Sequence, residues 1–195
     1  ARNLGEQPVS FSEGLTILSS LADAGMEKIN FAGGEPLLHS RLFDYCRAAH
    51  DAGMVVSITT NGSLLTKKMI EDHVDCIDWI ALSVDSASES TEKRLGRGYG
   101  EHVCHCVDLS DAIRDAGIRL KINTTVTRLT WEEDMADFIQ RTSPHRWKVF
   151  QMLHILGENN DAVADLAVTD EQFQAFCARH ADVDLRGDVQ PVFES

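Results

Sequence analysis

Short strand-like segments alternate with helical segments along this chain, and the alternation limits the folds it can adopt. Five segments rich in β-branched and aromatic residues are separated by helical patterns of ten residues or more. The segments are centred near residues 30, 58, 80, 122 and 149. Such alternation is typical of repeated β–α–β units, in which a parallel sheet carries helices on its outside. The sequence therefore predicts a single α/β domain over residues 1–195.

Polar and charged residues recur at every second position in four of these segments. Side chains alternate between the two faces of a strand, so residues two apart share a face. The residues in phase are Lys28 and Asn30, then Ser57, Thr59 and Asn61, then Lys121 and Asn123, then Arg146 and Lys148. A sheet covered by helices on both faces would instead show nearly continuous apolar strands. The pattern predicts a sheet curled into a barrel or half-barrel, with helices outside and a polar lumen within.

Four of these inward residues are cations that come from three strands, namely Lys28, Lys121, Arg146 and Lys148. An unpaired buried charge is costly, and Asp85 is the main acid expected on the same face. The lumen is therefore expected to hold a polyanion, and a triphosphate fits. In the alternative reading, the four cations lie on exposed strand ends and bind nothing.

The first strand ends in the sequence Gly33-Gly34-Glu35-Pro36. Glycine allows positive φ and a close approach of the backbone to a ligand, and proline fixes the chain just afterwards. In parallel α/β folds, ligands bind at the carboxyl ends of strands. The segment is a candidate binding loop, although a plain strand-to-helix turn would use the same residues.

The composition restricts the class of function. A formal charge of −13 and a pI near 4.9 argue against general nucleic-acid binding. No apolar run approaches the roughly 18 residues that span a bilayer. Five cysteines without framework spacing point to a reduced, cytoplasmic compartment. The ligand-type residues of 102–106 resemble a metal motif, but they open a helical pattern and should point in different directions.

Several motifs, in order and at matching intervals, make the chain similar to the viperin family of radical S-adenosylmethionine enzymes. The Gly-Gly-Glu-Pro sequence is shared widely among radical enzymes. The motifs more specific to viperins are Asn61-Gly62-Ser63-Leu64, Gly96-Arg97-Gly98, Lys121-Ile122-Asn123, Glu132-Glu133-Asp134-Met135, Arg146-Trp147-Lys148-Val149-Phe150-Gln151 and Gly157-Glu158-Asn159. The similarity extends from about Gly25 to the end of the chain.

The resemblance implies a partial (βα)6 barrel of the radical S-adenosylmethionine type with a short C-terminal extension. It implies a [4Fe–4S] cluster, S-adenosylmethionine and an electron donor for the cluster. Enzymes of this family cleave S-adenosylmethionine to a 5′-deoxyadenosyl radical, which removes hydrogen from C4′ of a nucleoside triphosphate (CTP, UTP or GTP). Loss of the 3′-hydroxyl then gives a 3′-deoxy-3′,4′-didehydro nucleotide, which terminates viral polymerase products.

The resemblance also assigns roles to individual residues and leaves the catalytic residues unassigned. The residues expected to bind S-adenosylmethionine are Gly33, Gly34 and Glu35 at its amino group, Ser83 and Arg97 at its ribose and carboxylate, and Asn61. The residues expected to bind the triphosphate are Lys121, Asn123, Arg146 and Lys148, with Lys28 as a fifth contact. The triphosphate set is the set of inward polar residues that strand phase identifies independently.

One departure from the family concerns the cluster. Radical enzymes hold it with a Cys-x3-Cys-x2-Cys loop before the first helix, and none of the five cysteines here has that spacing. We expect the cluster cysteines upstream of Ala1 and the family's C-terminal tail beyond Ser195. Two alternatives remain: a non-catalytic nucleotide-binding module on the same scaffold, and a radical enzyme that acts on a peptide.

Overall fold

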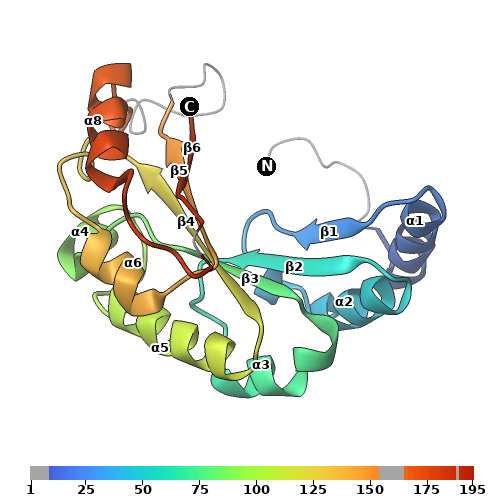
Figure 1. The fold of residues 1–195 in the computed structure, drawn as a ribbon. Helices are drawn as coiled ribbons and strands as arrows, with labels where there is room; N and C mark the ends of the chain where they lie inside the picture. The colour runs from blue at the N-terminus through green and yellow to red at the C-terminus, as the bar shows by residue number, and fades with distance from the viewer. Residues whose placement is uncertain (1–8, 154–164, 188) are drawn as a thin grey trace.

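The computed structural model describes residues 9–153, 165–187 and 189–195 (Figure 1). The motif Gly157-Glu158-Asn159 lies outside the described residues. The helices are α1 (Phe11–Asp23), α2 (Leu42–Asp51), α3 (Lys67–Asp72), α4 (Glu89–Arg94), α5 (His102–Asp115), α6 (Ala136–Thr142) and α8 (Asp170–His180), with 3-10 turns at Pro36–Leu38 and Val74–Cys76. The strands are β1 (Lys28–Phe31), β2 (Val55–Thr60), β3 (Trp79–Ser83), β4 (Arg119–Val126), β5 (Arg146–Gln151) and β6 (Val192–Glu194).

All six strands are parallel and lie in sequence order from β1 to β6. The sheet curls, and the helices lie along its convex side, while the concave side is left open (Figure 1). The predicted α/β partial barrel is confirmed. Because paired residues of parallel strands point to the same side, the register decides which side chains meet on each face.

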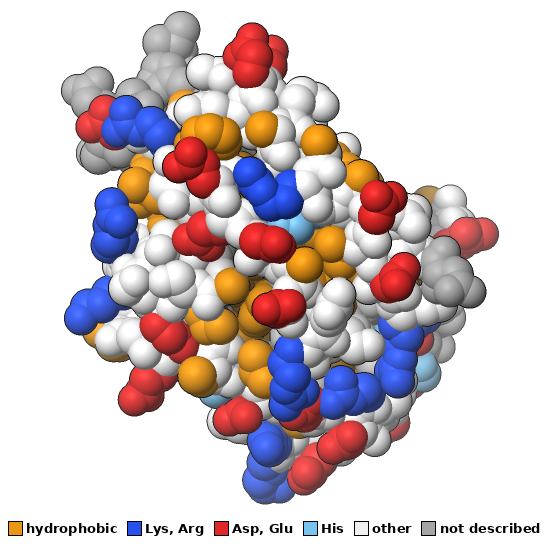
Figure 2. All heavy atoms as spheres, turned by 60° about the vertical axis from the view of Figure 1, so that its left-hand side comes forward, with side chains coloured by type: hydrophobic (Ala, Val, Ile, Leu, Met, Phe, Trp, Pro, Cys, Tyr) orange, Lys and Arg blue, Asp and Glu red, His pale blue; other side chains and the backbone are white. Residues whose placement is uncertain are grey.

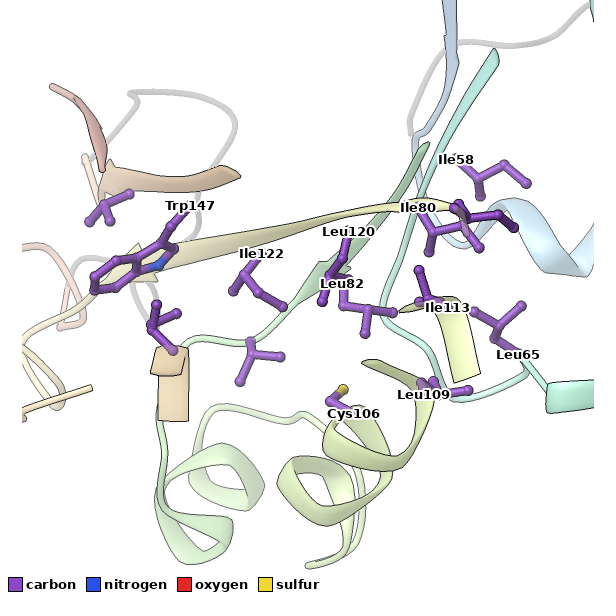
Figure 3. Close-up of a cluster of buried hydrophobic side chains, with 14 of the residues drawn as sticks. Ile58, Leu65, Ile80, Leu82, Cys106, Leu109, Ile113, Leu120, Ile122 and Trp147 are labelled. Carbon is purple, nitrogen blue, oxygen red and sulfur yellow. The ribbon is translucent and has the colours of Figure 1, made fainter. Parts of the chain in front are cut away.

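The convex face of the sheet forms the main core. Every second residue of β2, β3 and β4 is almost fully buried there, as the spacing predicts, and all of these residues except Thr60 and Thr124 are apolar. Figure 3 shows Ile80, Leu82 and Leu120 directed toward Leu109 and Ile113 of α5. Full burial of such a side chain contributes about 1.5–3 kcal/mol. These contacts fix the sheet on its helices and so fix which face remains open.

Two helices begin at sequence signals that the chain shows plainly. Ser10 caps α1 and Glu13 returns the bond to the backbone of Ser10, which forms a capping box. Thr169 and Gln172 form the same arrangement at α8. Each cap satisfies backbone N–H groups that have no partner within the helix.

Trp147 joins β5 to α8 on the convex side. Its indole is fully buried and packs edge-on against Phe176 and His180, with ring centroids 6.2 and 5.2 Å away. The indole Nε1 donates to Thr124 Oγ1 at 2.9 Å. Strand phase predicts this position, because Trp147 alternates with the inward residues Arg146 and Lys148, and the packing of Trp147 under the helices is confirmed.

The sequence pattern taken alone differs from the structure in three segments. It predicts an irregular segment over 183–195, yet this segment contains β6, whose three residues are too few to show a period of two. It predicts a loop through residues 96–100 after β3, and the segment before that loop contains α4, which is only six residues long. It predicts a helix over residues 131–141, but the helix begins at Ala136, because Thr130 and Trp131 form turns on Thr127.

Within the described residues, no helix is both long enough and apolar enough to cross a membrane. On the side of α4, α6 and α8, acidic and basic side chains are interspersed (Figure 2). This face shows no large area of a single charge.

His180 should make the stability of the fold sensitive to mild acid. The buried ring donates from Nδ1 to the Phe176 carbonyl at 2.8 Å and accepts from the Met135 N–H at 2.9 Å, so it is neutral. Burial lowers its pKa below the usual 6.5. The unfolded chain therefore binds this proton more readily, and stability is lost as the pH falls through about 6.5.

We expect His180→Gln to gain about 1–2 kcal/mol in free energy of unfolding relative to the parent protein as the pH falls from 7.5 to 5.5, because the variant lacks the group that takes up a proton on unfolding. Chemical denaturation of both proteins at each pH measures the difference. His50→Gln, on the exposed end of α2, is the matched control and should keep the parental pH dependence. An unchanged pH dependence in His180→Gln would contradict a neutral, buried His180.

Candidate active site

The concave face of the sheet, called the lumen below, carries the polar residues that strand phase predicts. Lys121 is paired with Arg146, and Asn123 is paired with both Ser83 and Lys148. Since paired residues share a face, these five side chains point to the same side of the sheet. The lumen also receives Lys28 and Asn30 of β1, Thr59 of β2, Trp79 and Ala81 of β3, Arg119 of β4, and Val192 and Glu194 of β6.

The cations lie in the amino-terminal half of the lumen. Lys28 and Arg146 are the first residues of their strands and are exposed, whereas Lys121 and Lys148 are half-buried. The reading of exposed strand ends therefore holds for two of the four cations. It does not hold for the two lysines that lie farther along the sheet.

Lys121 is the cation that the others affect most. Burial lowers the pKa of its amino group, and the positive charges of Lys148, Lys28 and Arg146 lower it further. The other three cations are thus close enough to repel the charge of Lys121. Within the described residues, Lys121 has no carboxylate within 4.0 Å.

Glu194 supplies an acid that sequence reasoning missed. Its carboxylate forms an ion pair with the amino group of Lys148. Glu194 lies in β6, and the pairing of Lys148 with Val192 brings it next to this lysine. One carboxylate among four cations leaves the lumen positively charged.

Asn123 offers a polar atom that the protein itself does not satisfy. Its side-chain oxygen is buried and has no hydrogen-bond partner in the described part of the chain. Buried polar atoms in folded proteins nearly always have a partner. This unsatisfied atom belongs to a residue beside Lys148 on the lumen face.

Glu35 fixes the loop at the carboxyl end of β1. Its carboxylate accepts hydrogen bonds from the Leu37 N–H at 3.1 Å, the Thr60 hydroxyl at 2.7 Å and the Asn61 N–H at 2.9 Å. The loop is thereby tied to the end of β2. Gly33 and Gly34 have φ of 95° and 49°, values that other residues rarely adopt. Nothing lies within 4 Å of either missing Cβ, so the backbone here is open to a ligand.

Arg97 is held by an acid at the carboxyl end of β3. Asp85 Oδ2 lies 2.5 Å from Arg97 Nε, and Asp85 Oδ1 accepts from the Thr125 N–H at 2.7 Å. Asp85 is buried, and the side chain of Arg97 is 26% exposed. The guanidinium is therefore fixed in direction and still accessible.

Glu92 of α4 supports this pair and was not predicted from sequence. Its side chain is fully buried, and its Oε1 accepts from the N–H groups of Asp85 and Ser86 at 2.6 and 2.7 Å. Its Oε2 has no hydrogen bond and lies 3.8 Å from Arg97 Nε. A six-residue helix carries no strong periodicity, so the sequence gives little signal for this residue.

The histidines of α5 hold the same end of the sheet. His102 donates from Nε2 to the Ser83 carbonyl at 3.0 Å, and His105 donates to the Gly62 carbonyl at 3.0 Å. Gly62 and Ser83 lie at the ends of β2 and β3. The metal-like sequence 102–106 thus has a structural role in positioning two loops.

A cavity of about 550 Å³ that polar and charged side chains help to line opens beside these loops. Its walls include Asn61, Ser63, Arg97, Gly98 and His102. This volume lies in the range of small-molecule and cofactor sites. A second groove of about 520 Å³, between α1 and the loop after β1, has mostly apolar walls and is less suited to a charged ligand.

The predicted site residues separate into two groups along the lumen. Gly33, Gly34, Glu35, Asn61 and Arg97 lie at the carboxyl ends of the strands. Lys28, Lys121, Arg146 and Lys148 lie toward the amino ends. The pair Ser83 and Asn123 lies between the two groups.

No metal centre is assembled by the described residues. No three His, Cys, Asp or Glu side chains among them are placed to hold a metal ion. Cys46, Cys76, Cys106 and Cys177 are buried, and Cys104 alone is exposed. Clusters are held by cysteine thiolates, so the described part of the chain does not fit an iron–sulfur cluster.

The pattern of the Radical SAM superfamily matches residues 4–142. The chain is 38% identical over 172 residues to an S-adenosylmethionine-dependent nucleotide dehydratase of Thermoplasmatales archaeon (strain ISO4-H5), covering 88% of this chain and 62% of that protein. It is 36% identical over 180 residues to the S-adenosylmethionine-dependent nucleotide dehydratase RSAD2 of Oncorhynchus mykiss, covering 85% of this chain and 51% of that protein. The chain thus spans about 40–60% of the length of the curated relatives it matches.

Two solved structures share the fold. Streptococcus suis SuiB bound to S-adenosylmethionine superposes with a TM-score of 0.74 at 17% identity, over 99% of this chain and 45% of that one. The structure named anSMEcpe with bound AdoMet and Cp18Cys peptide gives 0.71 at 14% identity, over 90% of this chain and 52% of that one. At this identity the likeness concerns the fold alone.

Glu92 should destabilise the protein increasingly as the pH rises. Burial raises its pKa from the usual 4.5 to about 7, and the nearby Asp85 acts in the same direction. Between these two pH values the folded state binds more protons than the unfolded state. Stability therefore declines as the pH rises through this window.

We expect Glu92→Gln, which keeps an acceptor for the two N–H groups, to gain about 1–3 kcal/mol relative to the parent protein between pH 5 and pH 8. Thermal unfolding followed by circular dichroism across this range measures the difference. Glu71→Gln on the exposed surface of α3 is the control and should show no such trend. A constant difference between Glu92→Gln and the parent would contradict a buried carboxyl that titrates near neutrality.

Proposed function

This chain belongs to the radical S-adenosylmethionine superfamily, and we propose that it converts a nucleoside triphosphate to its 3′-deoxy-3′,4′-didehydro analogue. The observation that carries the proposal is the separation of the lumen into an end where Glu35 and the Arg97–Asp85 pair fix two loops and an end that carries four cations. The cationic end suits the three phosphates of a nucleotide, and the other end suits S-adenosylmethionine. The names of the curated relatives support a nucleotide as the substrate.

In this proposal, S-adenosylmethionine binds at the carboxyl ends of the strands. The backbone of Gly33 and Gly34 receives its amino group, together with Glu35. A carboxylate offers about four acceptor positions, and three of those on Glu35 are occupied by the protein. Glu35 thus contributes one further hydrogen bond, and the glycine carbonyls contribute the rest.

Arg97, Ser83 and Asn61 complete the binding of S-adenosylmethionine. The exposed part of the Arg97 guanidinium suits a carboxylate, because its planar fork of donors matches two oxygens. The ion pair with Asp85 fixes the direction of that fork before the ligand arrives. Ser83 offers a hydroxyl to the ribose. Asn61 lies beside Arg97 on the wall of the cavity of about 550 Å³.

The triphosphate binds to Lys121, Asn123, Arg146 and Lys148, with Lys28 as a fifth contact. Phosphate oxygens neutralise the repulsion among the four cations and remove the penalty for burying Lys121. Asn123 lies in one row across the sheet with Ser83 on one side and Lys148 on the other. This arrangement presents the ribose between the phosphates and S-adenosylmethionine.

Bound S-adenosylmethionine, with a cluster supplied from outside the described residues, furnishes the group that accepts hydrogen from C4′ of the ribose. The residues of this chain orient the two reactants. Reaction requires the two atoms to be held within about 3–3.5 Å. Binding energy from the phosphates, which do not react, therefore serves to position the ribose.

The remaining expectations concern the surroundings of the enzyme. We place it in the cytoplasm, where its free cysteines remain reduced, with a protein electron donor for the cluster. Nucleic acid is not its substrate in this proposal, because the net charge of −13 opposes a second polyanion on the outer surface.

The charge of Lys121 should contribute strongly to nucleotide affinity. Contacts between charged groups are each worth about 1.5–3 kcal/mol, so Lys121→Met should weaken triphosphate binding about tenfold or more. Lys68→Met on α3, whose side chain is 79% exposed, should leave it unchanged. Calorimetric titration compares the two, and equal affinities in both variants would place the triphosphate outside the lumen.

The chemistry is tested by following a label from the nucleotide. Full-length protein with a reconstituted cluster, S-adenosylmethionine and a reductant should transfer deuterium from C4′ of the nucleoside triphosphate to 5′-deoxyadenosine. Deuterium elsewhere on the ribose should not transfer, and nucleosides should be poor substrates. Mass spectrometry that finds label from another position, or equal turnover without phosphates, would contradict the proposal.

A further inference from the structure

The amino-terminal end of the lumen contains an aromatic ring with two cations on it, and the residues proposed for the triphosphate do not account for it. The ring belongs to Trp79, the first residue of β3. The Arg119 guanidinium lies 4.6 Å from the centre of its ring, and the Lys28 amino group lies 5.3 Å from it. Both distances are within the range of favourable cation–π contact.

The register places this group on the lumen face. Trp79 is paired with Arg119, and the next residues on the same face, Ala81 and Lys121, are paired with each other. Arg119, Lys121 and Asn123 therefore follow one another along β4 at intervals of two residues. At about 3.3 Å per residue, this row of polar side chains spans about 13 Å.

Few negative charges oppose this end of the lumen. In the described part of the chain, the carboxylate nearest to Arg119 is that of Asp78, at 4.0 Å, and one oxygen of Asp78 already accepts from the Val56 N–H. Among the residues that the structure describes, Lys28 likewise has no carboxylate within 4.0 Å. The ring of His145 lies 6.1 Å from that of Trp79, and burial together with the charges of Arg186 and Arg119 lowers its pKa.

Stacking on Trp79 prepares Arg119 to bind an anion. A guanidinium that lies on an aromatic face keeps its N–H groups free at the edge, where they can grip a phosphate with two bonds. The ring also restricts the side chain before binding, which reduces the entropy lost when the complex forms. A lysine or an unstacked arginine would lack this restriction.

We propose that Arg119, held on Trp79 and assisted by Lys28, binds the terminal phosphate and makes the site selective for nucleoside triphosphates over diphosphates. This inference rests on the proposed function, because it assumes that the nucleotide enters with its phosphates toward the amino ends of the strands. Lys148 and Asn123 then meet the phosphate nearest the ribose, Lys121 and Arg146 the middle of the chain, and Arg119 its end. A diphosphate would leave Arg119 without a partner.

The test compares a nucleoside triphosphate and the diphosphate of the same base by calorimetric titration. Arg119→Gln should weaken binding of the triphosphate about tenfold or more and that of the diphosphate less than about twofold, so that the preference is largely lost. Trp79→Leu should reduce the preference in the same direction. Trp79→Phe keeps an aromatic face and should restore most of it, which separates positioning of Arg119 from a merely structural role.

Arg47→Gln on α2 is the matched control and should leave both affinities unchanged. Equal weakening of the two nucleotides by Arg119→Gln, or no weakening of either, would overturn this inference and leave the proposed function standing. Failure of the unaltered protein to bind any nucleotide would overturn the proposed function and this inference together. Circular dichroism of each variant verifies that the fold is retained.

Discussion

The uncompensated positive charge of the lumen is the constraint on which the rest of the structure depends. Lys121 is half-buried and surrounded by three further cations, and these neighbours lower its pKa. Glu194 is the acid that reaches the group among the described residues, and it pairs with Lys148. Such an arrangement costs free energy unless an anion joins it. The fold tolerates this unfavourable free energy on the concave face because the hydrophobic core on the convex face stabilises it.

The two faces of the sheet therefore have separate tasks. The convex face buries Ile80, Leu82 and Ile122 against helices and holds the strands in place. The concave face is free to carry polar groups. Because the strands are parallel, these groups are separated along the strand direction, between the amino ends and the carboxyl ends. Loops fixed by Glu35 and Asp85 lie at one end, and cations lie at the other.

The period of two in the strands made the lumen predictable, because it identified Lys121, Asn123 and Lys148 before any geometry was known. This period did not identify residues whose role depends on tertiary contacts. The role of Glu92 is to accept hydrogen bonds from the backbone at the end of β3. Its helix, α4, is too short to be recognised from the sequence. β6 has three residues, so the neighbour of Lys148 was not identified. Arg119 is in phase with the other cations, but its proposed role depends on contact with the Trp79 ring of another strand, which the sequence does not show.

The most direct test of this account is the pKa of the Lys121 amino group, measured by nuclear magnetic resonance on protein with isotope-labelled lysine. Without nucleotide, the account predicts a pKa below the value of about 10.4 that an unperturbed lysine shows. Saturation with a nucleoside triphosphate should raise the pKa of Lys121, because the bound anion favours the charged form. An ordinary pKa in the free protein, or no rise on adding the triphosphate, would contradict the claim that the lumen is a charged site awaiting a polyphosphate.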